Sequence, residues 1–163
     1  MSKEELNEFK VSAIFQNRLI TALKGEKESH IELANEIGIS KDILIRALNT
    51  GVIPGTRSLI KLADYTEESI DYLIGLIDTT FYAKSLDYIN FQDRLNELII
   101  HNHTKKGTIA STIGISRSSF NSWETHNYIP SLEVLFQLAN HFKVSLDYLL
   151  ARTNRETYKE ANP

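Results

Sequence analysis

The sequence predicts an all-α protein made of two similar five-helix domains. Shifting the chain by 76 positions aligns its two halves without a gap, and such a repeat indicates repeated structural units. Within each half, apolar residues recur at the spacing of amphipathic helices. Serines and glycines that can start or end helices fall between those apolar groups. Two units of about 60 residues favour two domains, because repeat arrays usually need three or more units.

The repeat sets the domain boundaries. We expect domains at residues 1–76 and 91–152, a segment at 77–90, and a polar, frayed tail at 153–163. The first members of the matching pairs are Phe15, Gln16, Arg18, Leu19, Ala34, Ile37, Gly38, Ile39, Ser40, Pro54, Leu59, Leu62, Ala63, Ser69, Asp71, Tyr72 and Leu73. Their partners are Phe91, Gln92, Arg94, Leu95, Ala110, Ile113, Gly114, Ile115, Ser116, Pro130, Leu135, Leu138, Ala139, Ser145, Asp147, Tyr148 and Leu149.

In the second domain, a first helix carries Leu95, Leu98 and Ile99 at helical spacing, and residues 102–104 end it. A second helix is expected at 105–113. Gly114 can adopt the left-handed conformation that ends a helix, and Ser116 can cap the next one at 117–125. The pattern therefore predicts two short helices joined by a three-residue turn.

The rest of the second domain follows a loop at 127–130. Ser131 is expected to cap a fourth helix, and Ser145 a last turn. The residues that these two helices direct inward are Leu132, Leu135, Phe136, Leu138, Ala139, Leu146, Leu149 and Leu150.

The first domain follows the same plan, with Ser29, Ser40, Thr56 and Ser69 as expected caps. A capping-box pattern at Ser2 and Glu5 predicts that its first helix starts early and runs to Lys24. The segment 77–90 contains Phe81, Tyr82, Leu86, Tyr88 and Ile89, which are costly to expose. We therefore expect this apolar and aromatic linker to pack the two domains together.

Composition narrows the function. The formal charge is −3 and the pI is about 6.0. Cysteine is absent, and its absence excludes disulfides, thiol catalysis and cysteine-ligated zinc. No signal peptide or membrane span is recognisable, so we expect a cytoplasmic protein. Residues 91–152 carry six basic and five acidic residues, and no acid occurs from Leu98 to Trp123. If the chain binds DNA, only part of it can do so, and this charge distribution favours the second domain.

The second domain resembles the Cro and phage-repressor type of helix-turn-helix domain, the XRE family of transcriptional regulators. Its matching features are Ala110, Gly114-Ile115-Ser116, Trp123-Glu124, Pro130-Ser131, Leu138-Ala139 and Val144 to Leu150. The first domain matches more weakly over the same length. The resemblance implies two tandem five-helix lambda-repressor-like helix-turn-helix domains, with double-stranded DNA as the partner and no cofactor.

Two departures from the family pattern concern charged positions. The family usually has Gln at the start of the second helix, where this chain has Lys106 and, in the first domain, His30. The family often pairs an Arg on the first helix with the late Glu of the third. Ile99 occupies that Arg position, so Glu124 is left without that partner.

The resemblance assigns the DNA contacts of the second domain. It implies base reading by Arg117, Ser118, Asn121 and Ser122, whose side chains can recognise base edges in the major groove. It implies phosphate contacts, which fix register without reading sequence, by Lys105, Lys106, Ser119, Thr125, Asn127 and Tyr128. Phe120 and Trp123 are interpreted as core residues.

The corresponding face of the first domain is different. Its positions are Lys41, Asp42, Ile45 and Arg46, with Ile43 nearby. DNA phosphates would repel the carboxylate of Asp42. Isoleucines on a protein surface often mark a contact with another protein. Three interpretations of this face remain open: a partner or dimer surface, a base-reading surface, or a face covered by the linker or tail.

The functional expectation is a sequence-specific DNA-binding regulator, most simply a repressor. The alternative is an interaction module, antirepressor or antitoxin-like, that keeps the fold but has lost DNA reading. Neither a catalytic set nor a metal-ligand spacing is recognisable in the sequence, so an enzyme is not expected.

Overall fold

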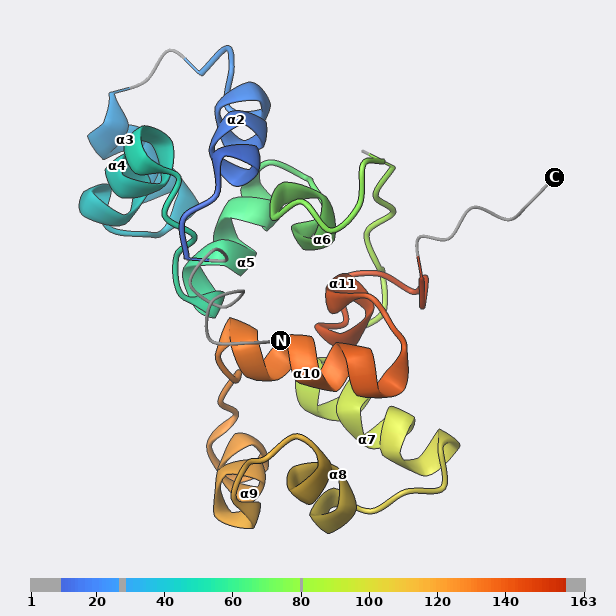
Figure 1. Ribbon diagram of the computed structural model, residues 1–163. Coiled ribbons are helices and arrows are strands. Elements are labelled where there is room, and N and C mark those ends of the chain that lie inside the picture. The colour runs from blue at the N-terminus through green and yellow to red at the C-terminus, as the bar shows by residue number, and fades with distance from the viewer. Residues whose placement is uncertain (1–9, 27–28, 80, 158–163) are drawn as a thin grey trace, which may run out of the picture. The chain divides into compact units, whose positions relative to one another are not determined.

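A computed structural model describes residues 10–26, 29–79 and 81–157. The chain divides into two compact units, Met1–Tyr82 (unit 1) and Ala83–Pro163 (unit 2). The regular secondary structure of the described residues is helical, apart from one isolated bridge between Val11 and Val52 (Figure 1). None of the described helices is long and apolar enough to cross a membrane. The all-α expectation is confirmed.

Unit 1 contains helices α2 to α6 around one apolar core. Their bounds are α2 Ala13–Ala22, α3 His30–Ile37, α4 Lys41–Thr50, α5 Thr56–Tyr65 and α6 Ile70–Leu73. Fully buried side chains come from α2, α4, α5 and α6, and they include Phe15, Leu19, Leu44, Leu59, Leu62, Ile70 and Leu73. Burial of this kind contributes about 1.5–3 kcal/mol for each large apolar side chain.

The first helix of unit 1 begins later than expected. Ser12 caps α2 by accepting a hydrogen bond from the Phe15 amide at 3.2 Å. Just before it, the Ser12 amide donates to the Gly51 carbonyl at 2.9 Å, so the chain is extended there. The prediction of one helix running from Ser2 to Lys24 is therefore wrong, and the Ser2–Glu5 capping box lies outside the described residues.

Three of the four caps predicted in unit 1 are confirmed. Ser29, Ser40 and Ser69 accept hydrogen bonds at the starts of α3, α4 and α6. Thr56 is the exception, because Gly55 precedes α5 as its N-cap and Thr56 is the first helical residue. The Thr56 side chain is buried.

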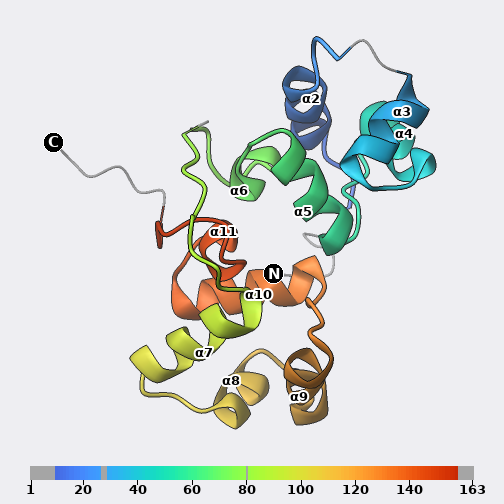
Figure 2. The ribbon, with the colours of Figure 1, turned by 180° about the vertical axis from the view of Figure 1, so that it is seen from behind.

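Unit 2 contains helices α7 to α11 (Figure 2). Their bounds are α7 Phe91–His101, α8 Lys106–Thr112, α9 Arg117–His126, α10 Leu132–Phe142 and α11 Leu146–Leu149. Helix α8 packs on α9, and α11 packs on both α7 and α10. Ser116 and Ser145 cap α9 and α11 as predicted. Ser131 occupies the N-cap of α10, although its side chain accepts no capping hydrogen bond.

Backbone conformation recurs between the units at the same interval of 76 residues. Gly38 and Gly114 end α3 and α8 with φ of 79° and 71°. Gly51 and Asn127 end α4 and α9 with φ of 66° and 54°. Left-handed conformations are uncommon in residues other than glycine, so their recurrence at equivalent positions is a specific feature of the repeat. The turn that ends α4 and the turn that ends α9 are therefore built from different residues, glycine in unit 1 and asparagine in unit 2.

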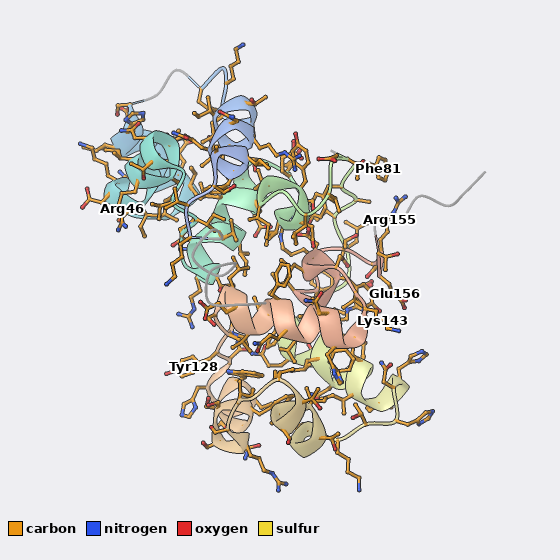
Figure 3. All side chains as sticks on the ribbon, in the orientation of Figure 1. Arg46, Phe81, Tyr128, Lys143, Arg155 and Glu156 are labelled. Atoms are coloured by element: carbon orange, nitrogen blue, oxygen red, sulfur yellow. The ribbon has the colours of Figure 1, made fainter. Side chains whose placement is uncertain are left out.

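The segment 77–90 does not bury its large apolar side chains as expected. Leu86 and Tyr88 are 87% and 106% exposed, and Phe81 is exposed as well (Figure 3). Polar contacts hold its two ends instead. Asp78 pairs with Arg18 at 2.8 Å, and the Ser85 amide donates to the Arg152 carbonyl at 2.8 Å.

The start of the tail is packed rather than frayed. Thr153 is fully buried, and the Ser145 amide donates to the Glu156 carbonyl at 2.7 Å. Asn154 accepts a hydrogen bond from Arg94 at 3.2 Å. The expectation of a frayed tail from residue 153 is therefore wrong for residues 153–156. Residues 158–163 lie outside the described part of the chain.

Candidate nucleic-acid interface

Helices α8 and α9 are joined by the tight turn that the sequence predicts. The Ile115 amide donates to the Ala110 carbonyl at 2.9 Å, and Gly114 takes the left-handed conformation. The Ser116 hydroxyl then accepts from the Ser119 amide at 3.0 Å, which starts α9. The two helices thus have the order and connection of a helix-turn-helix motif.

The inner face of α9 is anchored by aromatic packing. Phe120 and Trp123 are buried, with ring centroids 4.9 Å apart, and Phe91 meets Trp123 edge-on at 6.3 Å. Such aromatic pairs add about 0.5–1.5 kcal/mol to the burial of their area. The interpretation of Phe120 and Trp123 as core residues is confirmed.

Gln92 on α7 holds the far end of α9, a role that the sequence reasoning missed. Its amide nitrogen donates to the Trp123 carbonyl at 3.1 Å and to the Tyr128 carbonyl at 2.9 Å. Gln16 makes a similar bond to the Leu48 carbonyl, near the end of α4, at 2.8 Å in unit 1. The identity of Gln16 and Gln92 in the repeat was the available signal.

The outer face of α9 carries the predicted base readers. Arg117, Ser118 and Asn121 are exposed, and Ser122 is half-buried. The Ser122 hydroxyl donates to the Ser119 carbonyl at 2.7 Å, and Ser118 shares a hydrogen bond with Ser116 at 2.8 Å. Neither the Arg117 nor the Asn121 side chain forms a hydrogen bond or ion pair within the described part of the chain. These two are the best-placed side chains for an external partner.

Most predicted phosphate contacts lie around the two ends of this motif. Lys105 is the exposed N-cap of α8. Ser119, Thr125 and Asn127 are exposed, and Tyr128 lies in the loop after α9, where its ring stacks on His126 at 5.3 Å (Figure 3). The Thr125 hydroxyl donates to the Asn121 carbonyl at 3.0 Å. The set therefore surrounds α9 without covering its outer face.

Lys106 differs from this group because it is paired. Its ammonium donates to the Glu124 carboxylate, which joins α8 to α9. Glu124 lacks the arginine partner of the family, and Lys106 on the second helix pairs with it instead. Partly exposed ion pairs of this kind contribute about 0–1 kcal/mol.

A buried ion pair supports the frame behind the motif. Asp147 at the start of α11 accepts a hydrogen bond from Arg152, and both side chains are buried. Arg94 on α7 lies over the Tyr148 ring at 4.1 Å, as Arg18 lies over Tyr72 at the same distance in unit 1. Burying charges without partners is costly, so the Asp147–Arg152 pair satisfies two charges that unit 2 buries behind the motif.

The corresponding face of unit 1 is less apolar than expected. Lys41, Asp42 and Arg46 are exposed on α4, whereas Ile43 and Ile45 are half-buried. The exposed isoleucines of unit 1 lie elsewhere, at Ile14 and Ile20 on α2 and at Ile31 on α3. In the described residues, no three His, Asp or Glu side chains are grouped as metal ligands.

Comparison with protein families supports this reading of unit 2. Residues 93–155 match the family model of a helix-turn-helix domain. The matched span begins within α7, covers α8 to α11 and includes the packed start of the tail. No curated protein and no solved structure gave a significant match. Residues 93–155 are therefore similar to DNA-binding helix-turn-helix domains.

Proposed function

We propose that this chain is a sequence-specific DNA-binding transcriptional regulator, most simply a cytoplasmic repressor that acts by occupying its site. Helix α9 enters the major groove, where Arg117 and Asn121 read bases and Ser118 and Ser122 add contacts. Lys105, Ser119, Thr125, Asn127 and Tyr128 contact phosphates on either side, with Lys106 nearby. No catalytic step belongs to this proposal.

One observation carries the proposal. The second helix of a helix-turn-helix motif presents exposed Arg117 and Asn121, and neither side chain is engaged within the described residues. Arginine recognises guanine and asparagine recognises adenine by paired hydrogen bonds. The family match over residues 93–155 supports the same use of this helix.

A further part of the proposal concerns unit 1, as a second domain of the same fold. The shared left-handed positions and the two arginine–tyrosine stacks support it. A single small module rarely binds DNA tightly enough alone. The second half-site is therefore read either by another copy of the chain, dimerised through unit 1, or by unit 1 itself. Half-sites would lie about 34 Å apart, one helical turn of DNA.

The test is a titration of the full chain with random genomic fragments at two salt concentrations, followed by sequencing of the bound fragments. The regulator predicts enrichment of a shared half-site and affinity that falls steeply as salt rises, because phosphate contacts release counterions. Sedimentation of the free and bound protein then distinguishes a dimer of the chain from a single chain that reads DNA with both units. Absence of enrichment, or affinity indifferent to salt, contradicts the proposal.

The second candidate is a protein-interaction module, antirepressor or antitoxin-like, that has lost specific DNA reading. The exposure of Ile14, Ile20 and Ile31 on α2 and α3 favours a protein contact on unit 1, since exposed apolar side chains can mark such a site. If the chain is such a module, the titration enriches no DNA sequence. Such a module also predicts a complex with a partner that Ile20→Lys weakens while unit 2 remains folded.

A further inference from the structure

Glu124 is the only acidic residue between Leu98 and Leu132, and it lies on the helix that we propose enters DNA. Its carboxylate accepts a hydrogen bond from the Lys106 ammonium across the turn between α8 and α9. The same stretch contains only three basic residues, Lys105, Lys106 and Arg117. One of these three charges is therefore neutralised within the protein itself.

The pair lies among the residues proposed to contact phosphate. Glu124 is followed directly by Thr125, Asn127 and Tyr128, and Lys106 follows Lys105. The Lys106 and Glu124 side chains are 34% and 33% exposed, so water and an approaching phosphate can both reach them. A phosphate and the Glu124 carboxylate would compete for the same ammonium, since both are anions that accept its hydrogen bonds.

We propose that Glu124 withholds Lys106 from the DNA backbone and so limits how tightly unit 2 binds DNA of any sequence. This inference rests on the proposed function. With Lys106 held, phosphate binding depends on Lys105 and neutral polar groups. Discrimination between sequences then depends on Arg117 and Asn121, because backbone contacts carry no sequence information.

The first test is Glu124→Gln in the full chain, a change that keeps the side-chain shape and removes the charge. Released Lys106 adds one phosphate contact, so the slope of log affinity against log salt steepens by about 0.9. If binding tightens about tenfold at 50 mM salt, the same slope leaves a gain of about threefold at 200 mM. Preferred and random duplexes gain alike.

The second test combines this change with lysine substitutions. Lys106→Gln weakens binding by less than about twofold in the native background but removes the whole gain in the Glu124→Gln background. Lys105→Gln is the matched control. Lys105 forms no ion pair within the described residues, so its removal weakens binding equally in both backgrounds.

Four outcomes overturn the inference. Weaker binding by Glu124→Gln would mean that Glu124 positions Lys106 for the phosphate. A gain that persists alongside Lys106→Gln would mean that Glu124 repels DNA directly. Unchanged affinity in Glu124→Gln, with salt-dependent binding by the native chain and weakening by Lys105→Gln, refutes this inference alone. Native protein without salt-dependent binding instead refutes the proposed function and, with it, the inference.

Discussion

Individual side chains divide the proposed interface into groups that are free and groups that are held. Arg117 and Asn121 project from α9 without partners in the described part of the chain. Lys106 is held by Glu124, and the hydroxyls of Ser122 and Thr125 donate to carbonyls of their own helix. The sequence sorted these residues into base readers and phosphate contacts, without separating free side chains from engaged ones. Their contacts separate them, because a group that already has a partner must give it up to bind DNA.

Arg117→Ala is expected to weaken binding to the preferred sequence by about 1–3 kcal/mol and to relax the preference at one base pair. The reason is the loss of a paired hydrogen bond to one base. Selection and sequencing of DNA bound by the variant measures the preference. Lys105→Ala serves as the comparison and weakens all sequences alike. Equal losses on every sequence for both variants would contradict the division into base readers and backbone contacts.

Glu68→Gln is expected to stabilise unit 1 at neutral pH. Burial raises the pKa of the Glu68 carboxyl, while nearby Arg18 opposes this. Because the folded pKa lies above the unfolded one, the protonated carboxyl favours folding, and this contribution is lost as pH rises through the folded value. Glutamine keeps a neutral group at every pH.

The measurement is thermal unfolding at pH 7 and at a pH below the usual range of glutamate. The unfolding temperature of Glu68→Gln exceeds that of the native chain at pH 7, and the difference narrows at the lower pH. Glu67→Gln, at an exposed neighbour, is the control and shows a smaller change. A difference independent of pH would argue against burial as the cause.

At the scale of helices, the ends of α4 and α9 show how the repeat builds one geometry from two residue types. Gly51 and Asn127 both take left-handed backbone conformations. The two positions differ, however, in how closely another part of the backbone approaches them. A Cβ on Gly51 would lie 2.6 Å from the Ser12 carbonyl oxygen, where the N-terminal strand-like residues pair with the loop after α4. Glycine is thus required at Gly51 for space as well as for conformation.

Gly51→Ala is expected to destabilise unit 1 by about 1–3 kcal/mol, through strain at positive φ and displacement of the Ser12 backbone. Asn127→Gly at the equivalent position of unit 2 removes a side chain without a clash, so its effect stays within about 1 kcal/mol. Urea unfolding of both variants measures the difference. A loss in Gly51→Ala no larger than that in Asn127→Gly would contradict both the strain and the clash with Ser12 as its causes.

At the scale of the whole molecule, the two compact units share a core plan. Leu44 and Phe120 occupy the same repeat position, and both are fully buried. The single tryptophan of the chain, Trp123, belongs to unit 2. Its fluorescence therefore reports on unit 2, whereas helical circular dichroism reports on both.

If each unit folds around its own core, Leu44→Ala lowers the stability of unit 1 by about 2–5 kcal/mol and leaves the Trp123 unfolding curve unchanged. Phe120→Ala shifts that fluorescence curve by about 3–5 kcal/mol. Unfolding monitored by both signals makes the comparison. A shift of the fluorescence curve by Leu44→Ala would show that the two units unfold together.

The sequence by itself determined the helices, most of their caps and the repeat. Helical spacing, glycine and serine act over a few neighbouring residues, so local chemistry decides them. Leu95, Gly114 and Ser116 are examples whose predicted roles match the structure. The candidate DNA-facing residues came from the resemblance of the second domain to helix-turn-helix domains, and they stay a prediction.

The tertiary structure decided the features that depend on distant partners. These are the Lys106–Glu124 pair, the bonds of Gln92 to the end of α9, and the bond from Arg94 to Asn154 that holds the start of the tail against α7. The extended start of α2 also depends on a distant loop, since the Ser12 amide bonds to Gly51. No spacing along the chain specifies such contacts. They arise only when packing brings separate helices within hydrogen-bonding distance.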